Sequence, residues 1–136
     1  MTSLFADAFY WIALADVTDC FHQRVLSLTA ERATSGIVTT DEVLTEYLTF
    51  FSSSRPFRRR AAAGVQNLLV STVVRVIPQS RESFRAGVQL YAARPDKGYS
   101  LVDCISMETM RREGLHEVLT NDRHFEQEGF RVLFRE

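Results

Sequence analysis

Lysine, cysteine and long apolar stretches are scarce in this 136-residue sequence. The two cysteines, Cys20 and Cys104, are too few for a disulfide framework and lack the paired spacing of a zinc site, so we expect both to be reduced core residues. The apolar stretch at residues 8–15 follows an acidic residue and is far shorter than the roughly 18 residues that span a bilayer. These absences exclude a secreted disulfide scaffold and a membrane span, and they predict a cytoplasmic protein.

Neither sign of charge dominates the chain. Sixteen basic and 17 acidic residues give a formal net charge of −1, which excludes a histone-like nucleic-acid binder, so any basic patch must be local. Lys97 is the only lysine, and the other basic residues are arginines, which suit bidentate phosphate contacts. With 46% hydrophobic residues, the composition is that of an ordinary globular protein, and the length predicts a single domain over residues 1–136.

Strand-like and helix-like segments alternate along the chain. A short apolar run predicts a strand at residues 4–6, and apolar runs that are mostly rich in branched residues predict strands at residues 37–39, 73–77, 117–120 and 130–134. Helical spacing and capping residues predict helices near residues 8–15, 19–35, 41–51, 61–70, 80–94 and 100–114, with Thr40 or Asp41, Ser80 and Ser100 as caps. The crossovers are long enough for parallel pairing, so the fold class is an α/β sandwich.

Four acidic residues lie where parallel strands end, which is where open α/β sheets bind ligands. Asp7 follows the first strand, Glu46 lies in the helix after the second, Asp103 is in the first turn of a helix, and Asp122 follows the fourth strand. Each could be a cap or a solvated residue when taken alone. Together they would repel by about 4 kcal/mol per pair at ~4 Å, unless a divalent cation neutralises them. Oxygen ligands favour Mg²⁺ or Mn²⁺.

Several other acids compete for this role. The residues alone exclude none of them, and Glu42 shares a helix face with Glu46, so either of the two could reach the site. The remaining competitors are Asp16, Asp19, Asp41 and Asp96.

Four segments, taken in order and spacing, make the chain similar to PIN-domain ribonucleases, and most to the VapC-type toxins of toxin–antitoxin pairs. The segments are residues 4–7 with the aromatic residues 9–11 behind them, residues 39–46, residues 100–106, and residues 119–125 followed by Gly129 and Phe130. The stretch from residue 55 to residue 98 matches the family only in pattern.

The resemblance implies a three-layer PIN-like fold with a five-stranded parallel sheet of order 3-2-1-4-5. It also implies a metal site, for Mg²⁺ or Mn²⁺, made by Asp7, Glu46, Asp103 and Asp122, and it selects Glu46 over Glu42. The implied activity is metal-assisted hydrolysis of RNA phosphodiester bonds, which needs no protein nucleophile. A small antitoxin and a homodimer are the implied partners.

Alternatives from other classes remain open. One is a solitary nuclease, and another is a non-catalytic or receiver-like metal-binding module, although such a module needs a lysine beyond a late strand and Lys97 lies between two helices. The sequence lacks a phosphate-binding glycine loop, HExxH and a nucleophile elbow, which excludes the enzymes built on them.

Some polar residues have two interpretations. Arginines 55, 58, 59 and 60 around Phe57 could contact RNA phosphates and stack on a base, or they could form a solvated loop and helix start. Thr120 and Ser100 are expected to cap rather than to orient a ligand, and His124 is expected to pack or cap rather than to catalyse. His22 and His116 have no metal-ligand spacing.

Overall fold

The computed structural model describes residues 2–135, which form a five-stranded parallel sheet with seven helices. The strands are β1 (Leu4–Ala6), β2 (Ile37–Thr40), β3 (Val74–Ile77), β4 (Glu117–Leu119) and β5 (Arg131–Val132). The helices are α1 (Ala8–Ala15), α2 (His22–Glu31), α3 (Asp41–Phe50), α4 (Arg55–Leu69), α5 (Arg81–Ala93), α6 (Leu101–Glu113) and α7 (His124–Gln127).

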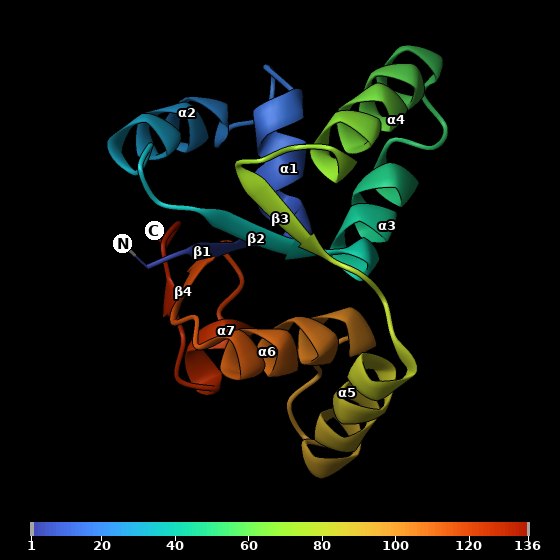
Figure 1. The fold of residues 1–136 in the computed structure, drawn as a ribbon, viewed down its shortest axis with the longest axis vertical. Coiled ribbons are helices and arrows are strands. Elements are labelled where there is room, and N and C mark those ends of the chain that lie inside the picture. Colours follow the sequence, from blue (N-terminus) through green and yellow to red (C-terminus); the bar gives the residue numbers. More distant parts are fainter. Residues whose placement is uncertain (1, 136) are drawn as a thin grey trace.

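The sheet order is β3-β2-β1-β4-β5 and every neighbouring pair is parallel. This confirms the expected order. In Figure 1, α1, α2 and α4 lie on one side of the sheet and α6 and α7 on the other, while α5 packs against α6. The central strand β1 is buried along its whole length, as expected for a strand covered by helices on both faces.

Hydrogen bonds between α1 and the sheet fix the orientation of α1 relative to β1. Trp11 is buried and its indole Nε1 donates to Thr39 Oγ1 at 3.3 Å, while the Thr39 hydroxyl donates to the Ala6 carbonyl at 2.8 Å. This chain of bonds ties the first turns of α1 to the ends of β1 and β2. The residue between β1 and α1, Asp7, is therefore held at the carboxyl edge of the sheet.

Helix starts follow the expected capping chemistry. Thr40 Oγ1 accepts from the Val43 amide at the start of α3, and Ser80 Oγ accepts from the Ser83 amide at the start of α5. Helix α6 ends at Gly114, whose φ of 69° is left-handed.

Some predicted boundaries and one burial were wrong. Helix α4 begins at Arg55 and not at residue 61, because Pro56 suits a first helical turn, so the arginine-rich segment is helical. Helix α2 begins at His22, and the last strand is only Arg131–Val132. Cys104 is buried as expected, but Cys20 is exposed because it lies in the turns between α1 and α2.

None of the helices within residues 2–135 combines the length and the apolar character that crossing a membrane requires.

Candidate active site

The two central strands bring Asp7 and Asp122 to the same edge of the sheet. In the register of β1 and β4, Ala6 lies beside Leu119, so the residues that follow each strand emerge together. Asp7 is the N-cap position of α1 and is only 8% exposed. Its backbone amide donates to the Leu119 carbonyl at 3.4 Å.

Thr120 joins the two acidic segments. Its buried hydroxyl donates to Asp7 Oδ2 at 2.9 Å and accepts from the Asp122 backbone amide at 3.2 Å. Thr120 was expected only to cap a backbone amide. Its hydroxyl accepts from the Asp122 amide and in addition fixes the Asp7 carboxylate. This contact depends on residues 113 positions apart, and no local sequence pattern reveals it.

The first turn of α6 supplies Asp103. Ser100 Oγ accepts from the Asp103 amide and Asp103 Oδ2 accepts from the Ser100 amide, both at 3.0 Å, which makes a reciprocal capping box. Ser100 thus caps the helix as expected. Asp103 uses one carboxylate oxygen in this box, and the carboxylate is held at the N-terminus of α6.

His124 lies between Asp103 and Asp122. Its Nδ1 atom is 3.3 Å from Asp122 Oδ1 and 3.7 Å from Asp103 Oδ2, and its backbone amide donates to Asp122 Oδ1 at 2.9 Å. The ring also packs against Tyr99, with centroids 5.2 Å apart. Packing was the expected role, and the structure adds a position beside two of the four acids.

Burial and mutual repulsion act on the carboxylates. Burial raises the pKa of Asp7 from 3.8 to about 6; the Thr120 hydrogen bond opposes this rise, and the charges of Asp103 and Asp122 add to it. Burial, with repulsion from Asp7 and Asp103, raises the pKa of Glu46 from 4.5 to about 7. The pKa of Asp103 is also raised, mainly by burial. Four acids from four segments therefore share one electrostatic environment.

The competing acids are used elsewhere or lie apart from this environment. Asp16 accepts from the Thr18 amide, Asp19 from the Phe21 amide, and Asp41 from the Gln79 amide. Asp96 is exposed in the loop between α5 and α6. Lys97, the only lysine of the sequence, is exposed in the same loop. A receiver-like module needs a lysine just beyond a late strand, and Lys97 lies between two helices instead.

An open groove of about 530 Å³ runs along α3 beside Glu46. Its wall on α3 consists of Glu42, Thr45, Glu46, Thr49 and Phe50, and Gln79 and Val102 line the remainder. Glu42 therefore faces the groove too, but the neighbouring charges that raise the pKa of Glu46 are those of Asp7 and Asp103. The groove gives solvent and an extended ligand access to Glu46.

The donor atoms at this edge fit a divalent cation. One oxygen each from Asp103 and Asp122 and one nitrogen of His124 lie within 4.8 Å of one another. Nδ1 of His124 is buried and makes no hydrogen bond with any atom of residues 2–135. An unpaired buried donor or acceptor is rare, and one that faces two carboxylates is suited to an ion. The sequence predicted oxygen ligands alone, so the structure adds a nitrogen to the available set.

Comparison with known proteins identifies one family. The PIN domain family model matches residues 4–130. A curated relative from Mycobacterium tuberculosis, the 23S rRNA-specific endonuclease VapC20, is 28% identical over 127 residues, which cover 93% of this chain and 95% of the relative.

Solved structures give the same result for the fold. The crystal structure of M. tuberculosis VapC20, described as a sarcin-ricin loop cleaving toxin, superposes with a TM-score of 0.84 at 29% identity and covers 94% of this chain and 96% of that one. DNA-bound VapBC from Salmonella typhimurium has a TM-score of 0.66 at 19% identity, and VapBC2 from Rickettsia felis bound to a promoter DNA fragment has 0.67 at 15%; each match covers 98% of both chains.

Proposed function

This chain belongs to the PIN domain family, and from that membership we propose that it is a single-domain endoribonuclease of the VapC type. The reaction is hydrolysis of RNA phosphodiester bonds. Asp7, Glu46, Asp103 and Asp122 are the proposed catalytic and metal-binding residues, with Mg²⁺ or Mn²⁺ as the ion. The fold is the one predicted from the sequence, and the site assignment is supported by the shared burial and charge of these four side chains.

The observation that carries the proposal is the convergence of carboxylates from separate segments at one edge of the sheet, where Thr120 links Asp7 to the Asp122 segment and His124 lies between Asp103 and Asp122. A fold that holds Asp7 almost fully buried beside other acids is destabilised unless something positive binds there. Perturbed acids of this kind cluster at functional sites. A divalent cation bound there would lower the pKa of a water molecule and stabilise the leaving oxygen.

The residues of the chain have separable roles in this scheme. Thr120 holds the Asp7 carboxylate in one orientation, and the capping box holds Asp103. Glu46 faces the groove and lies close enough to Asp7 and Asp103 for their charges to raise its pKa, which suits it to hold the ion together with them. His124 lies close enough to Asp103 and Asp122 to bind the ion with them or to orient them.

The proposed substrate class is ribosomal RNA, by similarity to VapC20, which is described as specific for 23S rRNA and as cleaving the sarcin-ricin loop. The two VapBC structures share the fold. We propose that this chain has a small antitoxin as its partner and that the antitoxin covers the acidic site. We also propose that the protein forms a homodimer and that it is located in the cytoplasm. Light scattering of the purified protein measures the oligomeric state directly.

The test is cleavage of an RNA hairpin with the sarcin-ricin loop sequence, and of a transfer RNA pool, by the purified protein. We expect cleavage with Mg²⁺ or Mn²⁺ that is lost in EDTA. Asp7→Asn and Asp103→Asn should each reduce it by about a hundredfold or more, since groups of this kind contribute several kcal/mol to transition-state stabilisation. Asp96→Asn is the matched control and should cleave normally. Cleavage that persists in EDTA and in both site variants would refute the assignment.

A further inference from the structure

About half of the arginines among residues 2–135 are paired with acids, and the cluster at the start of α4 is not. Arg94 and Arg111 contact Glu128, and similar pairs join Arg32, Arg131 and Arg135 to glutamates on the β4–β5 side of the fold. Four exposed arginines at the start of α4 make no ion pair with any acid of residues 2–135; they are Arg55, Arg58, Arg59 and Arg60. Arg60 lies over the Phe57 ring, which leaves Arg55, Arg58 and Arg59 without a side-chain partner.

These three side chains share one face of α4, since they are spaced by three and four residues. Like charges at this spacing repel. The N-terminus of a helix also carries partial positive charge, the first turn of α4 has no acidic residue, and the Ser54 side chain does not cap it. The arrangement is therefore electrostatically unfavourable in the free protein, and a bound anion would relieve it.

The arginine face is attached rigidly to the helix that carries Glu46. The Phe57 ring stacks on Phe51 just beyond the end of α3, with centroids 5.0 Å apart and planes at 10°. Arg58 donates to the Ser52 carbonyl at 2.9 Å, which fixes the connection between α3 and α4. The arginines thus hold a defined position relative to the acids.

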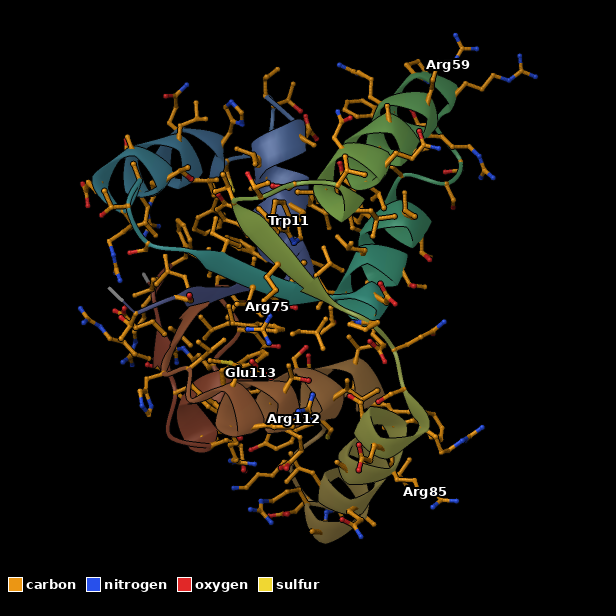
Figure 2. All side chains as sticks on the ribbon, in the orientation of Figure 1. Trp11, Arg59, Arg75, Arg85, Arg112 and Glu113 are labelled. Atoms are coloured by element: carbon orange, nitrogen blue, oxygen red, sulfur yellow. The ribbon has the colours of Figure 1, made fainter. Side chains whose placement is uncertain are left out.

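The groove beside Glu46 extends toward this face. It follows α3 from Glu46 to Phe50, and at about 1.5 Å per residue the axis advances roughly 6 Å between them. In Figure 2, Arg59 projects from the start of α4 at one end of α3, well away from the β4–β5 side of the molecule. The groove is lined by Glu46 and by none of the three arginines, so a ligand that contacts both must extend beyond the groove.

We propose that Arg55, Arg58 and Arg59 bind backbone phosphates of the RNA substrate at a point several nucleotides from the cleaved bond. The inference rests on the proposed function. Guanidinium groups pair with phosphate oxygens bidentately. The exposed neighbours Ser52 and Ser53 add hydroxyl groups that suit a nucleic-acid backbone, and the exposed Phe50 ring beside them suits the stacking of a base.

The experiment measures binding separately from cleavage. Fluorescence anisotropy in EDTA follows the binding of a labelled single-stranded RNA and of a labelled hairpin at several salt concentrations. The test variant is Arg55→Gln, Arg58→Gln, Arg59→Gln. The control is Arg112→Gln, Arg131→Gln, Arg135→Gln, which removes equal charge from exposed arginines that pair with acids on the other side. Thermal unfolding confirms that both variants fold.

We expect the test variant to bind RNA about tenfold more weakly or worse. The slope of log affinity against log salt should fall by about 2, at ~0.7 per lost phosphate contact on a single strand. The control should keep the wild-type slope. With Mg²⁺ or Mn²⁺ present, the test variant should show a higher KM for the hairpin and an unchanged kcat.

Equal affinity and equal slope in the two variants would overturn the inference and leave the nuclease assignment intact. If the unaltered protein binds neither RNA, the inference is overturned, and the cleavage assay above then decides the nuclease assignment independently.

Discussion

The hydroxyl of Thr120 donates to Asp7 Oδ2 at 2.9 Å and thereby stabilises the ionised form of a carboxylate that burial disfavours. Thr120→Val keeps the shape of the side chain and removes this bond. It also leaves the Asp122 amide without its 3.2 Å acceptor. We expect the variant to unfold about 1–3 kcal/mol more easily and to lose activity through a misplaced Asp7, as measured by urea unfolding and RNA cleavage.

Thr109 provides the matched control for this substitution. It is equally buried and lies in α6, but its hydroxyl has no hydrogen-bond partner among residues 2–135. Thr109→Val should therefore be neutral or stabilising, with unchanged cleavage. If Thr120→Val and Thr109→Val lower the free energy of unfolding equally, the hydrogen bond from Thr120 to Asp7 does not contribute to stability.

The charge of Asp7 should destabilise the metal-free protein. Its pKa is 3.8 when unperturbed and about 6 in the fold, so the folded state binds the proton more tightly than the unfolded state does. The destabilisation is absent below pH 3.8, grows between pH 3.8 and 6, and is complete above pH 6, at up to about 3 kcal/mol. In EDTA at pH 8, Asp7→Asn should thus be more stable than the wild type, although it is inactive.

Urea unfolding of both proteins in EDTA at pH 8 and pH 4 measures this effect. The stability advantage of Asp7→Asn should shrink toward zero at pH 4, where the wild-type carboxyl is protonated. Adding Mn²⁺ at pH 8 should stabilise the wild type more than the variant. A variant that is less stable than the wild type at pH 8 would contradict the burial of an uncompensated charge.

How far the sequence predicts this site depends on which contacts are local. Asp7 and Asp122 follow strands that can be predicted from short apolar runs, and parallel pairing then brings the two residues to one edge of the sheet. The Ser100 capping box is also a local pattern. These features could be predicted because each depends on neighbours in sequence or on a known rule of topology, whereas the sheet order came from the resemblance to PIN-domain ribonucleases.

The features that the sequence did not predict depend on distant contacts. The bond from Thr120 to Asp7 and the position of His124 between two carboxylates require the folded register of β4 and the start of α6. The boundary of α4 failed for another reason: a run of polar and basic residues was interpreted as a break, whereas the Phe57 contact with Phe51 holds it in a helix. Cys20 was placed in the core because cysteine usually is buried, but its turn is exposed.

Close packing of α5 on α6 depends on a glycine. A Cβ atom at Gly87 would lie 2.4 Å from Ile105 Cγ1 and 3.3 Å from the Ile105 backbone nitrogen, so the helices would have to separate. We expect Gly87→Ala to destabilise by about 1–3 kcal/mol in urea unfolding, despite the better helix propensity of alanine. Gly64→Ala is the control. Its Cβ would meet nothing closer than 4.0 Å, so that variant should gain up to ~1 kcal/mol. Equal effects at the two positions would contradict the packing argument.

The most strongly held acid outside the site is Glu128, whose side chain is 4% exposed. Burial opposes its charge, but hydrogen bonds from Arg94, Arg111 and Tyr99 outweigh this and lower its pKa from 4.5 to about 2. Because the folded-state pKa is depressed, the contribution to stability is complete above pH 4.5 and is lost as the pH falls toward 2. We expect Glu128→Gln to cost roughly 3 kcal/mol at pH 7 and much less at pH 2.5, as measured by urea unfolding at both values.

A surface pair gives the comparison for Glu128. Glu126 contacts Arg135 at 2.9 Å, but that arginine side chain is 58% exposed, so water screens the pair. Glu126→Gln should change the free energy of unfolding by less than about 1 kcal/mol at pH 7. Since Tyr99 bonds to Glu128 and also packs on His124, Glu128→Gln should in addition lower the cleavage rate, whereas Glu126→Gln should not. A Glu128→Gln protein with wild-type stability at pH 7 would mean that the two arginines and Tyr99 find other partners, and that His124 does not depend on this network.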